Sequence, residues 1–265
     1  MNIYDIAKEA GVSISTVSRV LNDKGYVSEK TKARIQEVLK KNKYQPSAIA
    51  RGLVSGTMKN VAIVTVDVRH PHYAMTTFIM EQKLTGLGYM VLVCNTGSRK
   101  EECMKYIRML SRNQVEGVIL VGSEFNDLCD PKELGELLPE TPIVMANGEL
   151  KLPNVQSVLV DEGYGVQLAV QHLYDKGHRN IAFVMDVKKD AGIRKRDGFL
   201  RKMKQLGYDD AAERILYTKY GAGGGNEAAK KIVGGSRRLD AVIFTEDLTA
   251  VYAMNALQNM GYRIP

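Results

Sequence analysis

The stretch SISTVSRVL, residues 13–21, decides how the start of this chain folds. Its apolar side chains Val17, Val20 and Leu21 are spaced to line one face of a helix, and Ser13 can cap the first turn. Hydroxyls and the guanidinium of Arg19 fall on the opposite face, where a partner can reach them. The pattern therefore predicts a short helix with one buried side and one polar side.

Another helix is predicted directly before this stretch. Apolar residues recur there at helical spacing, at Ile3, Ile6, Ala7 and Ala10. Gly11 can take the left-handed backbone conformation that ends a helix, so only a tight turn separates the two helices. This arrangement is a helix-turn-helix.

A third amphipathic stretch covers residues 29–43. Its lysines face outward, and we expect four apolar side chains to face inward: Ala33, Ile35, Val38 and Leu39. Three short helices can share one small core. The sequence therefore predicts an all-helical domain at the N-terminus.

Positive charge is concentrated in the same part of the chain. Residues 1–60 hold 11 Lys or Arg against 5 Asp or Glu, and the whole chain has a net charge of +7. Lysines and arginines that neutralise phosphates release condensed counterions, so a small basic segment suits a polyanion such as DNA. A solvated basic surface would show the same balance, and charge alone leaves both interpretations open.

Two runs of residues are more specific than spacing, which would also fit an ordinary helical hairpin. The first run combines Asp5-Ile6-Ala7, Ala10-Gly11-Val12-Ser13 and the residues from Thr16 to Asn22. The second runs from Tyr44 to Leu53. Together they closely resemble the DNA-reading headpiece and the hinge of the LacI/GalR family of bacterial transcription regulators, although Ser47 stands where many members have Asn.

The resemblance implies which headpiece side chains meet DNA. Three match positions that reach base edges in the major groove: Ile14, Ser15 and Arg19. Four match positions that largely contact the DNA backbone: Thr16, Ser18, Asn22 and Tyr26. The chemistry agrees, because Arg presents a bidentate donor pair to guanine while hydroxyls and amides suit phosphates. The alternative for Arg19 is an ordinary surface arginine.

The hinge is expected to fold only on DNA. Pro46 can open a helix at its first turn, but a helix from Ser47 to Leu53 is too short to be stable alone in water. The resemblance implies that Ala50 and Leu53 of both subunits enter the minor groove, where Leu53 acts as an apolar wedge that bends the duplex. The alternative for Leu53 is a linker leucine packed on the core.

From Asn60 onward the pattern changes to alternating strands and helices. Strands are predicted at residues 61–68, 90–94, 117–122, 143–146, 157–160, 181–185 and 241–245. Helices are predicted at residues 101–110, 166–174, 193–206 and 248–260. Such alternation is typical of parallel sheets with helices on both faces, which bind ligands at the carboxyl ends of their strands.

This second region is similar to the two-lobed core of the same family, which resembles periplasmic sugar-binding proteins. The matching residues are Asp161, His172-Leu173, Gly177-His178-Arg179, Gly198-Phe199 and Asp247. The resemblance implies a small-molecule effector, a sugar or a sugar phosphate, bound between the lobes. Its contacts would come from the first lobe at His72, Tyr73, Ser123 and Asn147, and from the second at Lys189, Lys195, Tyr220 and Asp247.

The effector's charge is left open by a basic stretch in the second lobe. Residues 188–204 contain eight Lys or Arg against two Asp. Lys195, flanked by Arg194 and Arg196, stands where many sugar-sensing relatives have Arg. The stretch could favour a phosphorylated effector or a phosphorylated protein partner, and a solvated helix face is the simpler interpretation.

An enzyme on a doubly wound fold is the main alternative class. The run from Gly221 to Asn226 begins like a dinucleotide loop, but it lacks the third glycine and follows no predicted strand, so we interpret it as a flexible turn. The sequence contains no Walker loop and no Gly-x-Ser-x-Gly elbow. His70-Pro71-His72 has no nearby carboxylate or cysteine to complete a metal site. We therefore expect no catalysis, no cofactor and no metal.

Cysteines and apolar runs indicate the compartment. Cys94, Cys103 and Cys129 are an odd count without Cys-x-x-Cys spacing, which predicts buried, inert thiols. The N-terminus shows no signal-peptide pattern, and the longest apolar runs are too short to cross a bilayer. We expect a cytoplasmic protein.

These observations predict a headpiece at residues 1–45, a hinge helix and linker at 46–59, and two α/β core lobes at 60–155 and 156–265. Members of the family continue past Pro265, so the resemblance implies an incomplete second lobe. The expected function is a homodimeric repressor that binds a pseudo-palindromic operator under effector control. A truncated module that binds DNA weakly and without ligand control is the remaining alternative, and dimerisation would separate the two.

Overall fold

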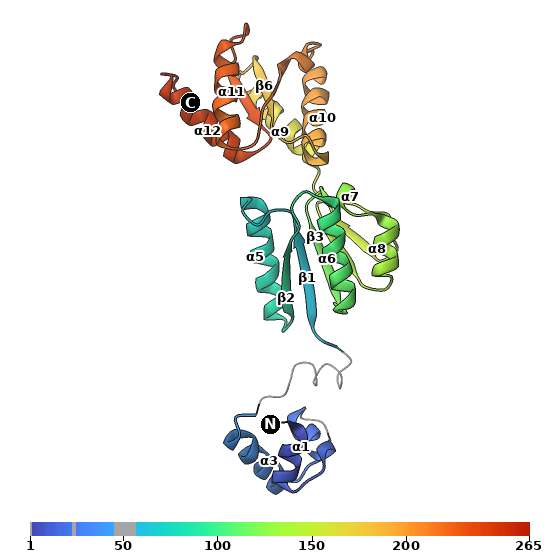
Figure 1. The fold of residues 1–265 in the computed structure, drawn as a ribbon. Coiled ribbons are helices and arrows are strands. Elements are labelled where there is room, and N and C mark those ends of the chain that lie inside the picture. Colours follow the sequence, from blue (N-terminus) through green and yellow to red (C-terminus); the bar gives the residue numbers. More distant parts are fainter. Residues whose placement is uncertain (1, 23–24, 45–56) are drawn as a thin grey trace.

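The computed structural model describes residues 2–22, 25–44 and 57–265 of the chain (Figure 1). Residues 45–56, which include Ala50 and Leu53, lie outside this part. The roles expected for those two residues therefore stay predictions.

Three helices form the headpiece: α1 (Ile3–Ala10), α2 (Ile14–Leu21) and α3 (Glu29–Lys41). Asn2 caps α1 by accepting hydrogen bonds from the backbone N–H groups of Tyr4 and Asp5. Ser13 caps α2 in the same way, by accepting from the N–H of Thr16. The predicted helix-turn-helix is confirmed, and both of its helices start at side chains that satisfy otherwise unpaired N–H groups.

The headpiece core takes one fully buried side chain from each helix, namely Ile6, Val17 and Ile35. Gly11 has a φ of 61°, the left-handed conformation expected at the end of α1. Ala33 was predicted inside but is exposed. It lies two positions before Ile35, which on an α-helix is a rotation of about 200°, so it faces away from the core.

Lobe 1 of the core is built on a five-stranded parallel sheet with the strand order β2-β1-β3-β4-β5. Its strands are β1 (Asn60–Thr65), β2 (Met90–Asn95), β3 (Gly117–Val121), β4 (Ile143–Ala146) and β5 (Val155–Val158). Its helices are α5 (Pro71–Gly86), α6 (Lys100–Arg112), α7 (Phe125–Leu128) and α8 (Pro131–Leu137). Every residue of β1 is buried, whereas β2 forms an edge of the sheet.

Lobe 2 is built on a three-stranded parallel sheet with the order β7-β6-β8. Its strands are β6 (Ile181–Met185), β7 (Ile215–Tyr217) and β8 (Ala241–Phe244). Its helices are α9 (Glu162–Asp175), α10 (Asp190–Gln205), α11 (Ala222–Gly234) and α12 (Asp247–Asn259), with a short 3₁₀ turn at Ala211–Arg214. The predicted alternation of strands and helices is confirmed.

Several local features of the core differ from the sequence prediction. β5 pairs with β4, so residues 156–158, which the predicted boundary gave to lobe 2, belong to the sheet of lobe 1. β7 was not predicted, because it is only three residues long. α5 was not predicted either, because its outward face carries Met75 and Phe78 and so lacks a clear polar side.

Glycines allow the helices of lobe 2 to approach closely. A Cβ on Gly198 of α10 would lie 2.1 Å from the carbonyl oxygen of Gly163 in α9. A Cβ on Gly225 would lie 2.8 Å from the carbonyl oxygen of Thr249 in α12. The interpretation of residues 221–226 as a flexible turn was wrong, because these glycines begin α11 and bring it against α12.

The three cysteines are buried and free, as the sequence predicted. Cys103 and Cys129 lie in the core of lobe 1 with their sulfur atoms 3.6 Å apart. In the part of the chain that the structure describes, no helix combines the length and the apolar character needed to cross a membrane.

A groove of about 660 Å³ runs along one edge of lobe 2. Its walls come from the end of α11, from β8 and from α12, and they include Val242, Phe244, Met254 and Tyr262. None of its lining residues was predicted to contact the effector. The groove is therefore separate from the candidate effector site.

Candidate functional sites

The exposed face of α2 carries the headpiece residues expected at DNA. Ser15 and Arg19 are exposed, Ile14 is 39% exposed, and Tyr26 after the helix is 91% exposed. Thr16, Ser18 and Asn22 are half-buried at the edge of the same face. All seven predicted residues therefore present at least part of their side chains to solvent.

Local hydrogen bonds hold several of these polar groups in place. The Ser13 hydroxyl lies 2.8 Å from the hydroxyls of both Ser15 and Thr16. The Asn22 amide donates to the Ser18 carbonyl over 2.9 Å, which also closes the last turn of α2. These contacts orient hydroxyls and an amide along one helix before any partner binds.

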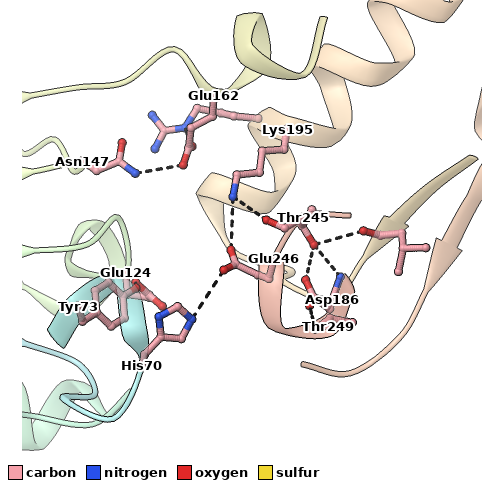
Figure 2. A network of polar contacts seen from close by, with 12 residues as sticks. His70, Tyr73, Glu124, Asn147, Glu162, Asp186, Lys195, Thr245, Glu246 and Thr249 are labelled. Carbon is pink, nitrogen blue, oxygen red and sulfur yellow. Dashed lines mark hydrogen bonds and ion pairs between the residues drawn. The ribbon is translucent and has the colours of Figure 1, made fainter. Parts of the chain in front are cut away.

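The second candidate site lies where the two lobes face each other (Figure 2). Its centre is a group of three rings, His70 and Tyr73 from lobe 1 and Tyr220 from lobe 2. The His70 ring stacks on Tyr220 with centroids 5.0 Å apart and lies 5.1 Å from Tyr73. His70 precedes α5, and Tyr73 lies in its first turn, so the start of this helix directs both rings toward lobe 2.

Polar contacts from lobe 1 surround these rings. The Tyr73 hydroxyl donates to the Glu124 carboxylate, which follows β3. Asn147, which follows β4, donates to Glu162 at the start of α9 over 3.0 Å. The last of these contacts joins one lobe to the other (Figure 2).

Asn126 adds a second polar link between the lobes. Its amide donates to Asp190 of α10 over 2.8 Å. Its carbonyl oxygen accepts from the backbone N–H of Glu149 within lobe 1, which fixes the orientation of the side chain. Two side-chain amides, Asn126 and Asn147, therefore donate across the interface between the lobes.

Lobe 2 contributes a chain of charged and hydroxyl groups. Lys195 of α10 donates to the Thr245 carbonyl over 2.9 Å and to the Glu246 carboxylate over 3.3 Å. The other Glu246 oxygen lies 3.7 Å from Nε2 of His70, so this carboxylate also links the lobes. Asp186, which follows β6, accepts from the hydroxyls of Thr245 and Thr249 (Figure 2).

Burial and nearby carboxylates raise the pKa values of the two tyrosines in the cluster. Burial, and then the hydrogen bond to Glu124, raise the pKa of Tyr73 above its ordinary value, and the negative charges of Glu246 and Glu162 add to this. Burial also raises the pKa of Tyr220, with smaller contributions from Glu246 and Asp186. Both phenols therefore stay protonated and can donate hydrogen bonds at neutral pH.

Several buried polar atoms of the cluster have no hydrogen-bond partner in the described residues. They include Nδ1 of His70, Oδ1 of Asn147 and Oε2 of Glu162, which nevertheless lies 3.4 Å from the Arg194 guanidinium. Buried donors and acceptors are normally paired, so such atoms favour a position where a ligand or water binds.

The structure brings some of the predicted cleft residues together and leaves others apart. Tyr73, Asn147, Lys195 and Tyr220 belong to the cluster, and Ser123 is buried beside it after β3. His72 is exposed, with its ring 5.6 Å from Tyr73. Lys189 and Asp247 are exposed at the starts of α10 and α12, and among the described residues no hydrogen bond or ion pair joins either side chain to the cluster.

Sequence reasoning missed His70 and four carboxylates of the cluster: Glu124, Glu162, Asp186 and Glu246. All five lie shortly after a strand of a parallel sheet, where such folds bind ligands. A search of the residues that follow each predicted strand would have found them.

The chain matches known proteins over almost its whole length. Residues 2–47 match the bacterial regulatory proteins of the lacI family, and residues 58–265 match the periplasmic binding proteins and sugar binding domain of the LacI family. An HTH-type transcriptional regulator of Lachnoclostridium phytofermentans is 32% identical over 100% of this chain and 80% of its own length. This chain belongs to the LacI family.

Two further members of the family resemble this chain. The HTH-type transcriptional repressor PurR of Mannheimia succiniciproducens is 29% identical over 99% of this chain and 78% of its own length. The structure of the Lac repressor dimer bound to operator and the anti-inducer ONPF superposes with a TM-score of 0.85 at 21% identity, over 100% of this chain and 79% of the other. Like its relatives, this LacI-family chain is a DNA-binding transcription regulator and not an enzyme.

Proposed function

We propose that this LacI-family chain is a homodimeric transcription repressor that acts on a pseudo-palindromic operator in the cytoplasm and is controlled by a sugar-type effector. The observation that carries the proposal is the combination, in one chain, of an exposed polar face on α2 and a ring-lined polar cluster between two lobes. The first suits base edges and phosphates, and the second suits a small polar ligand with apolar faces.

At the operator, Arg19 and Ser15 would contact bases, and the hydroxyls and amide beside them would contact phosphates. Ala50 and Leu53 would enter the minor groove from two hinge helices. The two headpieces of a dimer would read half-sites about one helical turn apart, because a single headpiece has little specificity.

A dimer surface is available on lobe 1. Strand β2 is an edge of the sheet, and α5 lies beside it. Large apolar side chains are exposed there: Met75 at 60%, Phe78 at 59%, Ile79 at 48% and Met90 at 62%. Monomeric proteins rarely expose contiguous apolar surface of this kind, so it supports a homodimer formed through lobe 1.

Effector control would work through the contacts that join the lobes. A ligand that binds the closed and open lobe arrangements unequally shifts their populations and changes the spacing of the two hinges. The coupling to operator affinity is expected to be about 1–3 kcal/mol, the usual range for such effects.

Sedimentation of the purified chain with a library of palindromic DNA, followed by sequencing of the retained DNA, tests the proposal. We expect a dimer on a symmetric site. Phe78→Glu should give a monomer with weak, salt-sensitive and sequence-blind binding, whereas Leu168→Glu, at an exposed apolar residue of α9, should leave the dimer intact. A monomeric unsubstituted chain that shows no sequence preference would contradict the proposal.

A further inference from the structure

We propose that the polar cluster between the lobes selects an effector that carries a protonated amine on a polyhydroxy skeleton, as an amino sugar does, and rejects phosphorylated sugars. The inference rests on the proposed function, because it takes the cluster around His70 as the effector site. It concerns the charge of the ligand, which the basic sequence of residues 188–204 left open.

Carboxylates outnumber cations in this cluster. Four carboxylates belong to the cluster: Glu124, Glu162, Asp186 and Glu246 (Figure 2). The cations that reach them are Arg194, beside Glu162, and Lys195, beside Glu246. The basic stretch on α10 is therefore partly neutralised by carboxylates of the cleft itself.

Two of the carboxylates have no cation beside them. Glu124 accepts from the Tyr73 hydroxyl, and Asp186 accepts from the hydroxyls of Thr245 and Thr249. Across residues 2–22, 25–44 and 57–265, no Lys or Arg lies within ion-pair distance of either carboxylate. An ionised carboxylate only accepts hydrogen bonds, so both groups favour a ligand that brings donors and positive charge.

Other cations close to the cluster along the chain do not offset its excess of negative charge. Arg69 is paired with Asp67 at 2.8 Å, and the bonds that it donates lower the pKa of Asp67 to about 2. Lys188 lies over the Tyr217 ring at 5.7 Å, and Lys189 is exposed next to Asp190. A phosphate group at the centre would therefore meet uncompensated carboxylates, and ionised phosphate offers them no proton to share.

The rings suit an ammonium group attached to a flat, partly apolar skeleton. Aromatic faces attract cations within about 6 Å, and the rings of Tyr73 and Tyr220 lie 5.1 and 5.0 Å from that of His70. The unpaired Nδ1 of His70 and Oδ1 of Asn147 can take up hydroxyls of the same ligand. An ammonium near Glu246 would also replace the contact of 3.7 Å that this carboxylate now makes with His70.

Calorimetric titration of the full chain with glucose, glucosamine and glucose 6-phosphate tests the inference on one skeleton. We expect glucosamine to bind about tenfold more tightly than glucose, a ratio in keeping with a cation held by aromatic faces, and glucose 6-phosphate to bind most weakly. Tighter binding of glucose 6-phosphate, equal binding of glucosamine and glucose, or no binding of glucosamine would each overturn the inference.

Variants show whether the carboxylates cause the preference. Glu124→Gln keeps an oxygen for the Tyr73 hydroxyl but removes the charge, and it should bring the affinity ratio of glucosamine to glucose close to one. Asp186→Asn is a second test in lobe 2 should the first variant fail to fold. Glu140→Gln, on the exposed segment before β4, should keep the full ratio. An unchanged ratio in both cleft variants would overturn the inference.

Operator binding by the unsubstituted chain, measured on the same sample, separates this inference from the proposed function. Sequence-specific DNA binding without a preference for the amine would contradict only the inference. A preference for the amine without any operator binding would contradict only the proposed function.

Discussion

The headpiece and the cleft between the lobes build their candidate sites in opposite ways. In the headpiece, one helix of eight residues presents the residues expected to read DNA, and its orientation depends on a few caps and a small core. In the cleft, the groups follow β1, β3, β4, β6, β7 and β8 or lie on α5, α9, α10 and α12, so they meet only because two sheets and their helices are correctly packed.

This difference predicts that the two sites respond differently to substitution. A single exposed side chain of α2 can be removed without disturbing the fold, and the loss should appear as a change in DNA sequence preference. The cleft should respond to changes that touch none of its polar groups but move the elements that carry them.

Gly198→Ala should have the largest effect and should disturb the cleft more than the headpiece. Its methyl group would lie 2.1 Å from the Gly163 carbonyl oxygen, so α9 and α10 would have to separate, moving Glu162 and Lys195. Overpacking costs about 1–3 kcal/mol, and a backbone contact this close should bring the loss in unfolding free energy of the core to about 3 kcal/mol. Urea denaturation measures this loss.

The matched control lies on the same helix pair. A Cβ on Gly165 of α9 would have no heavy atom within 4 Å, so Gly165→Ala should be neutral or should stabilise the core by about 0.5–1 kcal/mol. Equal destabilisation by both substitutions would show that the close approach of α9 and α10 does not hold the cleft together.

Arg19→Ala should change DNA recognition and leave the core unaffected. Because the Arg19 side chain is exposed, the fold should survive, while discrimination between operators falls by about 1–3 kcal/mol. Binding selection from a DNA library measures the loss. Arg34→Ala, at an exposed residue of α3, is the control and should keep the sequence preference. An unchanged sequence preference in the Arg19 variant would show that Arg19 does not read bases.

The same contrast explains how much the sequence could predict. Helical spacing and Ser13 predicted α2 correctly, because the signals for a short capped helix are local. The sequence favoured His72 as the cleft ring, whereas the structure places His70 there, two positions earlier. Which of two nearby rings turns inward depends on the path of the chain from β1 into α5, and that path is set by tertiary packing.

The net charge of the cleft could not be predicted from the sequence either. Residues 188–204 look basic along the sequence, but Glu162 and Glu246, which offset Arg194 and Lys195, come from other elements. Likewise, the glycines of residues 223–225 cannot be distinguished from a turn until α12 is seen packed against Gly225. Contacts between distant elements decide these features, and one sequence does not reveal such contacts.

Acid should weaken the core through a carboxylate of lobe 2 that lies outside the cleft. In lobe 2, Asp210 accepts from Arg214 over 3.0 Å and pairs with Arg237 at 2.6 Å, and these bonds, Arg214 foremost, lower its pKa. A carboxyl whose pKa is lower in the folded than in the unfolded state stabilises the fold above its unfolded pKa, and this contribution is lost as the pH falls through the folded pKa. Core stability should therefore decline below about pH 4.

Asp210→Asn should cost the core about 1 kcal/mol at pH 7, because water reaches Asp210 and screens its pairs, and it should flatten the acid slope. Asp209→Asn, at its exposed neighbour, is the control and should leave that slope in place. Denaturation followed from pH 7 to pH 3 measures both variants. An identical slope in the two variants would show that Asp210 does not account for acid sensitivity.

Asn126→Asp should have the smallest effect on stability and the most specific effect on the cleft. An aspartate keeps an oxygen for the Glu149 N–H within lobe 1, but it replaces the donor that now binds Asp190 of lobe 2 over 2.8 Å. Two carboxylates would then face each other across the interface, which favours the open arrangement of the lobes by about 0.5–1 kcal/mol in solvent-accessible surroundings.

The open arrangement must close again when an effector binds, so the apparent affinity of the cleft should fall by a few fold, while binding by the headpieces alone stays the same. Small-angle X-ray scattering should show a larger radius of gyration for the ligand-free variant. Asn255→Asp, on the exposed face of α12, adds the same charge away from the interface and should change neither quantity. If both variants scatter like the unsubstituted chain, the Asn126 contact does not hold the lobes together, and the rings and Glu246 must do so without it.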